Sequence, residues 1–162
     1  MFIALAASVL SVCGGIEVDK GLSKQVDECP TIQEKIAYLA SVISTNATST
    51  TAGNLRTSSA ITLLGRVGGT NVIQTLVTNL TFIDARYHGS PASDALAKIG
   101  DPAVPELLNV VKESGDEEQI RWAAMTVGFI KRHMWKDFMD EQKHKLPEEA
   151  WKKLKRYAII VQ

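Results

Sequence analysis

The sequence predicts an all-α protein built from repeated helical hairpins. Two helices meet with almost no loop in the stretch ALAKIGDPAVPELL (residues 95–108), where apolar residues keep helical spacing on both sides of a Gly-Asp-Pro break. Similar segments lie one period before this stretch and one period after it. Because repetition at a fixed period defines a whole architecture, these two observations together give the fold class.

The break itself carries the signals that end one helix and begin another. Gly100 stands where a left-handed residue ends a helix, and Asp101 suits the N-cap because its carboxylate can accept hydrogen bonds from the free amides of the next turn. Pro102 suits the first helical position, where its missing N–H is not needed. The apolar stripe resumes at Val104, Leu107, Leu108 and Val111. The stretch therefore predicts a tight helical hairpin.

Three segments superpose at a spacing of 32 and then 31 residues. At four equivalent positions the three segments carry residues of the same kind: alanines, larger apolar residues, small residues and branched residues. The matched sets are Ala60, Ala92 and Ala123; Leu64, Leu96 and Val127; Gly65, Ala97 and Gly128; and Val67, Ile99 and Ile130. Small residues at equivalent places indicate close helix approaches. The pattern predicts three stacked hairpins that share one apolar interior.

Residues 92–108 (ASDALAKIGDPAVPELL), followed by IRWAAMTVGFI at 120–130, resemble the short bacterial HEAT-type repeats of the PBS-lyase-like class. The resemblance covers about residues 55–130. It implies a short right-handed α-α superhelix, a HEAT-like solenoid of about three helical hairpins with capping helices at both ends. The chain departs from the pattern at Ser58 and Ser90, which stand where the last repeat has Arg121, so no ladder of arginine contacts between repeats is implied.

The length of 162 residues fits one domain with a sizeable core. We expect the repeat domain to span residues 30–162, with the clear repeats at 55–130 and capping helices at 131–162. An amphipathic helix is expected after Pro30, with apolar residues at Ile32, Ile36, Leu39, Val42 and Ile43. It would cover one end of the array, since terminal repeats need closing. The polar, aperiodic run 44–54 predicts a surface loop.

Residues 131–162 do not continue the repeat pattern, and they carry a net positive charge. They hold nine basic and five acidic residues, whereas residues 1–130 hold nine and thirteen, so the whole chain is neutral. One predicted helix presents Met134, Trp135, Phe138 and Met139 on one face. The next presents Trp151, Leu154, Tyr157, Ala158 and Val161 on one side, and Lys152, Lys153, Lys155 and Arg156 on the other. We interpret this segment as a capping hairpin with solvated lysines; binding to an acidic surface or to anionic lipid headgroups is the alternative.

The first residues are typical of an export signal. Residues 2–12 are apolar and uncharged but shorter than the roughly 20 residues that span a bilayer. Small residues at 13–15 suit cleavage, and the run up to Cys13 also resembles a lipoprotein signal. We assign residues 1–15 to a signal or lipoprotein signal segment and expect an exported protein, periplasmic, extracellular or lipid-anchored. The alternatives are a buried first helix or a misassigned start, which leave the protein cytoplasmic. Cys29 is expected to be a buried small hydrophobe, or to pair with Cys13.

Catalytic and metal-binding patterns are not found in the sequence. None of His88, His133 and His144 has a second histidine or carboxylate at i+3 or i+4 in a plausible inward-facing ligand arrangement, and no nucleophile, phosphate-loop or Cys-x-x-Cys motif occurs. We therefore expect no catalytic residues, no metal and no cofactor. Nucleic-acid binding is also not expected, because the total charge is neutral and few stacking residues interleave with basic ones.

These patterns favour a noncatalytic protein-interaction or scaffold module over an enzyme. Its partner would be a protein of unknown identity, and it would meet a membrane only through the N-terminal segment. Solenoids present exposed helix faces to partners, and the outward residues of the second helices are Gln74, Thr78, Glu106, Asn109 and Glu113. The alternatives are a bilin-lyase-like enzyme, which the resemblance suggests, and a structural end-piece of a larger assembly.

Overall fold

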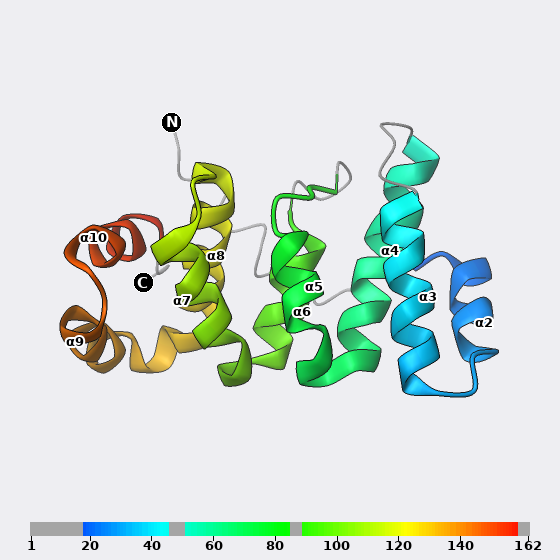
Figure 1. Cartoon of the computed structure of the whole chain (residues 1–162), viewed down its shortest axis with the longest axis horizontal. Helices are drawn as coiled ribbons and strands as arrows, with labels where there is room; N and C mark the ends of the chain where they lie inside the picture. The colour runs from blue at the N-terminus through cyan, green and yellow to red at the C-terminus, as the bar shows by residue number, and fades with distance from the viewer. Residues whose placement is uncertain (1–17, 46–50, 85–88, 159–162) are drawn as a thin grey trace.

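The computed structural model describes residues 18–45, 51–84 and 89–158, and these residues are helical apart from short connections (Figure 1). The helices are α2 (Lys20–Asp27), α3 (Ile32–Thr45), α4 (Thr51–Gly68), α5 (Ile73–Thr78), α6 (Pro91–Ile99), α7 (Val104–Glu113), α8 (Glu117–Lys131), α9 (Trp135–Lys145) and α10 (Glu148–Tyr157). Short 3-10 turns at Gly69–Val72, Asp101–Ala103 and Arg132–Met134 lead into α5, α7 and α9. The all-α prediction is confirmed.

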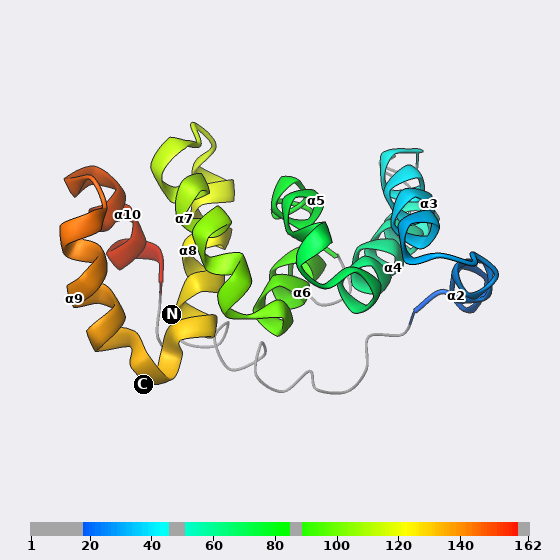
Figure 2. The ribbon, with the colours of Figure 1, turned by 60° about the horizontal axis from the view of Figure 1, so that its bottom comes forward.

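The helices lie in a row along the longest axis of the molecule, from α2 at one end to α9 and α10 at the other (Figure 1). Helices α4, α6, α8 and α10 each pack against the next in that order. Helix α3 packs on α4, α5 on α6 and α7 on α8, and α5 also contacts α7. In Figure 2, α3 and α5 lie above α4 and α6. The described helices therefore form two layers with the core between them.

Two of the four sets that superpose in the sequence are buried in the structure. Ala60, Ala92 and Ala123 are fully buried on α4, α6 and α8, and so are Leu64, Leu96 and Val127. Glycine is required where α4 meets α6, because a Cβ added to Gly65 would lie 2.5 Å from the Cβ of Ala95. A Cβ on Gly128 would lie 3.3 Å from the Cβ of Ala158, which follows α10. The expected close approaches are confirmed at these two positions.

The hairpin between α6 and α7 differs from the prediction at one residue. Gly100 ends α6 with a φ of 79° and donates its N–H to the Leu96 carbonyl at 3.0 Å, as expected. Asp101, however, is the first residue of the 3-10 turn and does not cap it. Its carboxylate pairs instead with Lys131 Nζ at 2.8 Å, at the end of α8. The N-cap prediction was wrong because the turn begins at Asp101 itself and a cation from another helix lies within reach.

Helix α2 has no counterpart among the predicted elements. Asp19 caps it by accepting a hydrogen bond from the Leu22 amide at 2.9 Å, and Leu22 and Val26 are buried against the rest of the protein. The helix packs on both α3 and α4. The Asp19 N–H also donates to Ser59 Oγ at 3.0 Å. The packed body of the protein therefore begins before Pro30.

Helix α3 starts and ends with polar side chains that serve its own backbone. Thr31 Oγ1 accepts from the Glu34 amide and Glu34 accepts from the Thr31 amide, both at 3.2 Å, which forms a capping box. At the other end the Ser44 and Thr45 hydroxyls donate to the Ser41 carbonyl at 2.9 and 2.7 Å. Helix α3 runs to Thr45 and so continues into the predicted loop 44–54. That loop prediction was too long, since α4 already begins at Thr51; residues 46–50 lie outside the described residues.

Helices α9 and α10 follow the predicted hairpin with two corrections, the first of which is that Lys153 is half-buried and not exposed like the other cations of α10. Phe138, Met139, Leu154 and Ala158 are buried, and Lys152, Lys155 and Arg156 are exposed. Met134 is 63% exposed, because it lies in the 3-10 turn before α9 and not on the buried face of that helix. Val161 lies outside the described residues.

The N-terminal predictions fall mostly outside the described residues, which exclude residues 1–15 and Cys13. Cys29 is half-buried at the end of α2, so the prediction of a buried residue was only partly correct. Within the described ranges, no helix combines the length and the apolar character needed to cross a bilayer.

Candidate functional site

The five predicted contact residues lie on the neighbouring helices α5 and α7. Ile73, Leu76 and Val77 bury one side of α5, and Val104, Leu107 and Val111 bury one side of α7. The opposite sides therefore face solvent. The predicted residues there are Gln74, Thr78, Asn109 and Glu113, which are exposed, and Glu106, which is half-buried. Because α5 contacts α7, we name these five residues together the α5–α7 surface.

The α5–α7 surface is polar, and only some of its side chains are available to a partner. The Thr78 hydroxyl donates to the carbonyls of Gln74 and Thr75, at 3.0 and 2.9 Å, so it serves the helix backbone. Glu113 lies 3.8 Å from Lys112 Nζ, a loose pair in which the glutamate side chain stays 76% exposed. The two glutamates give the surface an acidic character.

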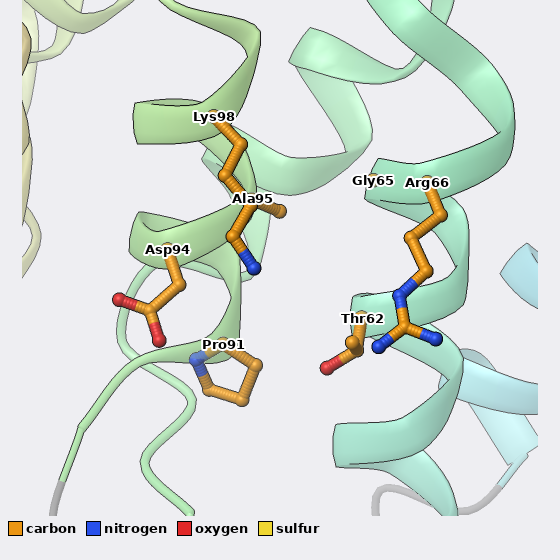
Figure 3. Close-up of a pocket in the computed structure, with 7 residues that line it drawn as sticks. All are labelled: Thr62, Gly65, Arg66, Pro91, Asp94, Ala95 and Lys98. Atoms are coloured by element: carbon orange, nitrogen blue, oxygen red, sulfur yellow. The ribbon is translucent and has the colours of Figure 1, made fainter. Parts of the chain in front are cut away.

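A second feature is a hollow between α4 and α6, with a volume of about 170 Å³ (Figure 3). It lies beside the close contact between Gly65 and Ala95, both of which line it. Both helices supply its lining, which comprises Thr62, Gly65 and Arg66 from α4 and Pro91, Asp94, Ala95 and Lys98 from α6. This hollow was not expected from the sequence. A signal was present, because Arg66 and Lys98 lie one repeat period apart.

Three charged side chains surround the hollow, and none of them forms a close ion pair with another. Arg66, Asp94 and Lys98 are exposed, and among the described residues none of the three forms an ion pair within 4.0 Å. Desolvation by the surrounding residues raises the pKa of the Asp94 carboxyl, and the positive charge of Lys98 opposes this shift by a smaller amount. The hollow is therefore bordered by charged groups that are available to bind a ligand.

Several other buried polar side chains bind groups of the protein itself, although the buried Ser58 hydroxyl has no hydrogen-bond partner among the described residues. Ser93 on α6 and Thr126 on α8 lie with their hydroxyl oxygens 2.7 Å apart in the core. The Thr126 hydroxyl donates to the Trp122 carbonyl at 2.7 Å, so Ser93 is the donor in the pair. Ser90 caps α6 by accepting from the Ser93 amide at 3.3 Å, whereas Ser58 is fully buried. Arg121, at the equivalent position of the last repeat, pairs with Glu118 of its own helix.

Within the described ranges, no three histidine, cysteine or acidic side chains lie close enough together to hold a metal ion. His133 accepts a hydrogen bond from Arg132 Nε at 3.0 Å, and His144 is exposed on α9. His88 lies outside the described residues.

No protein-family model, curated protein or solved structure matches the chain. The class of the protein is therefore defined by its own geometry. In the described residues it is an all-helical protein with polar helix faces and a small hollow open to solvent.

Proposed function

We propose that this chain is a noncatalytic protein-interaction module whose hairpins form a short HEAT-like superhelix. The observation that carries the proposal is the shared environment of Ala60, Ala92 and Ala123, which are fully buried on helices that pack in the order α4, α6, α8. A repeated unit stacked on its neighbours buries one continuous core and leaves extended outer faces for binding. Helices α9 and α10 would cap one end, and α2 and α3 the other.

The α5–α7 surface is the proposed contact region. It belongs to the second helices of two adjacent hairpins, and its charged members are the acidic Glu106 and Glu113. A partner with a basic patch would complement it and would be steered by the charge. The hollow between α4 and α6, at about 170 Å³, is smaller than the roughly 300–1,000 Å³ of small-molecule sites. A hollow of this size does not suit a pigment.

We also propose that the chain is exported through residues 1–15. The support is the apolar, uncharged composition of this segment and its small residues before position 16. Cell fractionation combined with N-terminal sequencing of the mature protein tests this part. A chain that keeps residues 1–15 and stays in the cytoplasm contradicts it.

The binding function is tested by reversing two charges on the proposed surface. The variant Glu106→Lys/Glu113→Lys should fold normally by far-ultraviolet circular dichroism, and the partner identified by crosslinking and mass spectrometry should bind it more weakly. The matched control is Asp27→Lys/Glu28→Lys. It changes the net charge equally on exposed residues at the end of α2, where cations suit the helix C-terminus.

Undiminished binding by Glu106→Lys/Glu113→Lys would remove the α5–α7 surface as the contact region. An equal loss of binding by Asp27→Lys/Glu28→Lys would show that binding depends on net charge and not on the α5–α7 surface. Light scattering of the purified chain separates a module that binds other proteins from an end-piece that assembles with copies of itself.

A further inference from the structure

We propose that the hollow between α4 and α6 receives a glutamate side chain of a protein partner, and that Arg66 and Lys98 bind its carboxylate. The hollow is lined by α4 and α6 alone, whereas the α5–α7 surface lies on other helices. The site can therefore be tested without the partner of that surface, and either proposal can fail while the other stands.

The size of the hollow indicates a single side chain as its occupant. Its volume of about 170 Å³ is well below that of typical small-molecule pockets, about 300–1,000 Å³. Its walls between the charged groups are largely apolar, with the ring of Pro91 and the methyl group of Ala95 on the α6 side (Figure 3). The methylene groups of a glutamate can pack there, while the rest of the partner remains outside.

The charges indicate that the occupant is acidic. In Figure 3 the guanidinium of Arg66 lies beside Thr62 on α4, and the Lys98 side chain runs past Ala95 toward Pro91 on α6. Lys98 runs this way because side chains on a helix tilt toward its N-terminus. The two cationic groups thus border the hollow from both helices, and neither has an ion-pair partner among the described residues.

The other polar groups at the hollow do not replace these cations. The Thr62 hydroxyl already donates to the Ser58 carbonyl at 2.9 Å, so it supplies no proton to a ligand. The Asp94 carboxylate points away from Arg66 in Figure 3. Recognition of a carboxylate therefore depends on the guanidinium, which can bind both oxygens, and on the ammonium group.

The repeat places the two cations on the same side of adjacent helices. Arg66 and Lys98 lie 32 residues apart, the spacing that superposes the first two repeats, so they occupy equivalent positions on adjacent helices. The next equivalent position, 31 residues further, is Phe129 on α8. The paired cations are thus confined to the space between α4 and α6.

The test uses the full chain and a short, terminally blocked alanine peptide with one central glutamate. In an NMR titration, this peptide should produce saturable shifts of the backbone amides of Arg66, Ala95 and Lys98. The same peptide with glutamine in place of glutamate has nearly the same shape but no charge, and it should produce no saturable shift. Equal shifts from the two peptides would overturn the proposal, as would the absence of a saturable response to the glutamate peptide.

Substitutions then test which side chains bind the glutamate peptide. Arg66→Gln and Lys98→Gln should each weaken the apparent Kd of the glutamate peptide by up to about fivefold, the effect of one exposed ion pair, and the double variant should weaken it further. Asp94→Asn should strengthen binding, because it removes a like charge beside the hollow. The matched control is Lys20→Gln/Lys24→Gln, which removes two exposed cations on α2 and should leave the Kd unchanged. Unchanged binding by Arg66→Gln/Lys98→Gln, or equal loss in the control, would refute the site.

Discussion

The contact between Gly65 and Ala95 provides the sharpest test of how the helices stack. An alanine side chain at residue 65 would place its Cβ 2.5 Å from the Cβ of Ala95 and 3.4 Å from its Cα. Such a distance is shorter than real Cβ contacts, so α4 and α6 would have to move apart. Overpacking of this kind costs about 1–3 kcal/mol. The gain in helix propensity from glycine to alanine offsets about 1 kcal/mol of that cost.

Gly128→Ala is the matched comparison, because its Cβ would lie 3.3 Å from the Cβ of Ala158 and needs only a small adjustment. We expect Gly65→Ala to lower the free energy of unfolding by up to about 2 kcal/mol. Gly128→Ala should be neutral or should stabilise the protein by up to about 1 kcal/mol. Urea denaturation followed by circular dichroism at a helix wavelength measures both. In a chain of this size, each kcal/mol corresponds to about 2–4 °C in Tm.

A double-mutant cycle adds a second check. Ala95→Gly alone should destabilise the protein, because glycine costs about 1 kcal/mol in a helix interior. In the Gly65→Ala background it should cost less, because it removes the atom that clashes. Equal stability of Gly65→Ala and Gly128→Ala, or additive effects of the two substitutions at 65 and 95, would refute the reasoning that α4 and α6 are held together at this point.

Two further predictions concern buried and charged groups. Ser93→Ala should lower the free energy of unfolding by about 1 kcal/mol, whereas Thr126→Val, which leaves the Ser93 hydroxyl unpaired, should lower it by about 1–3 kcal/mol. The double variant should lose less stability than the sum of the two single losses. Additive losses in urea denaturation would contradict the hydroxyl pair. The pKa of Asp94 should lie above its ordinary value of 3.8 when its carboxyl carbon is titrated by NMR. Because the folded pKa is raised, the stability from the protonated carboxyl is present below the unfolded pKa and is lost as the pH rises through the folded pKa. The free energy of unfolding of Asp94→Asn, relative to that of the native chain, should therefore be higher at neutral pH than in acid. Lys98→Gln should raise the pKa of Asp94 further.

The sequence was most informative where a structural feature depends on nearby residues. Gly100 ended α6 as expected, and Ser90 capped the same helix, because both signals act within one turn. Signals of the same kind were present but overlooked at Asp19, and at Thr31 with Glu34, where a capping residue precedes an apolar stripe. The cap at Asp19 marks the start of α2, which was not predicted. The capping box at Thr31 and Glu34 agrees with the predicted start of α3 after Pro30.

The sequence was less informative where the choice of partner depends on how helices pack. Asp101 had the right chemistry for an N-cap, yet it pairs with Lys131, a residue 30 positions later in the chain. Met134 fitted an apolar stripe, but the turn before α9 placed it in solvent. In both cases the local pattern was read correctly and the outcome was decided by the start of a turn or by a neighbouring helix.

The sequence by itself determined the helical class, the period of the repeat and the buried face of most helices, since spacing and caps act within a few residues. Only the tertiary structure decided that Gly65 lies against Ala95 and that Arg66 and Lys98 border one hollow. These relations depend on the distance and angle between two helices. That geometry is fixed by the packing of many side chains together and not by any one segment.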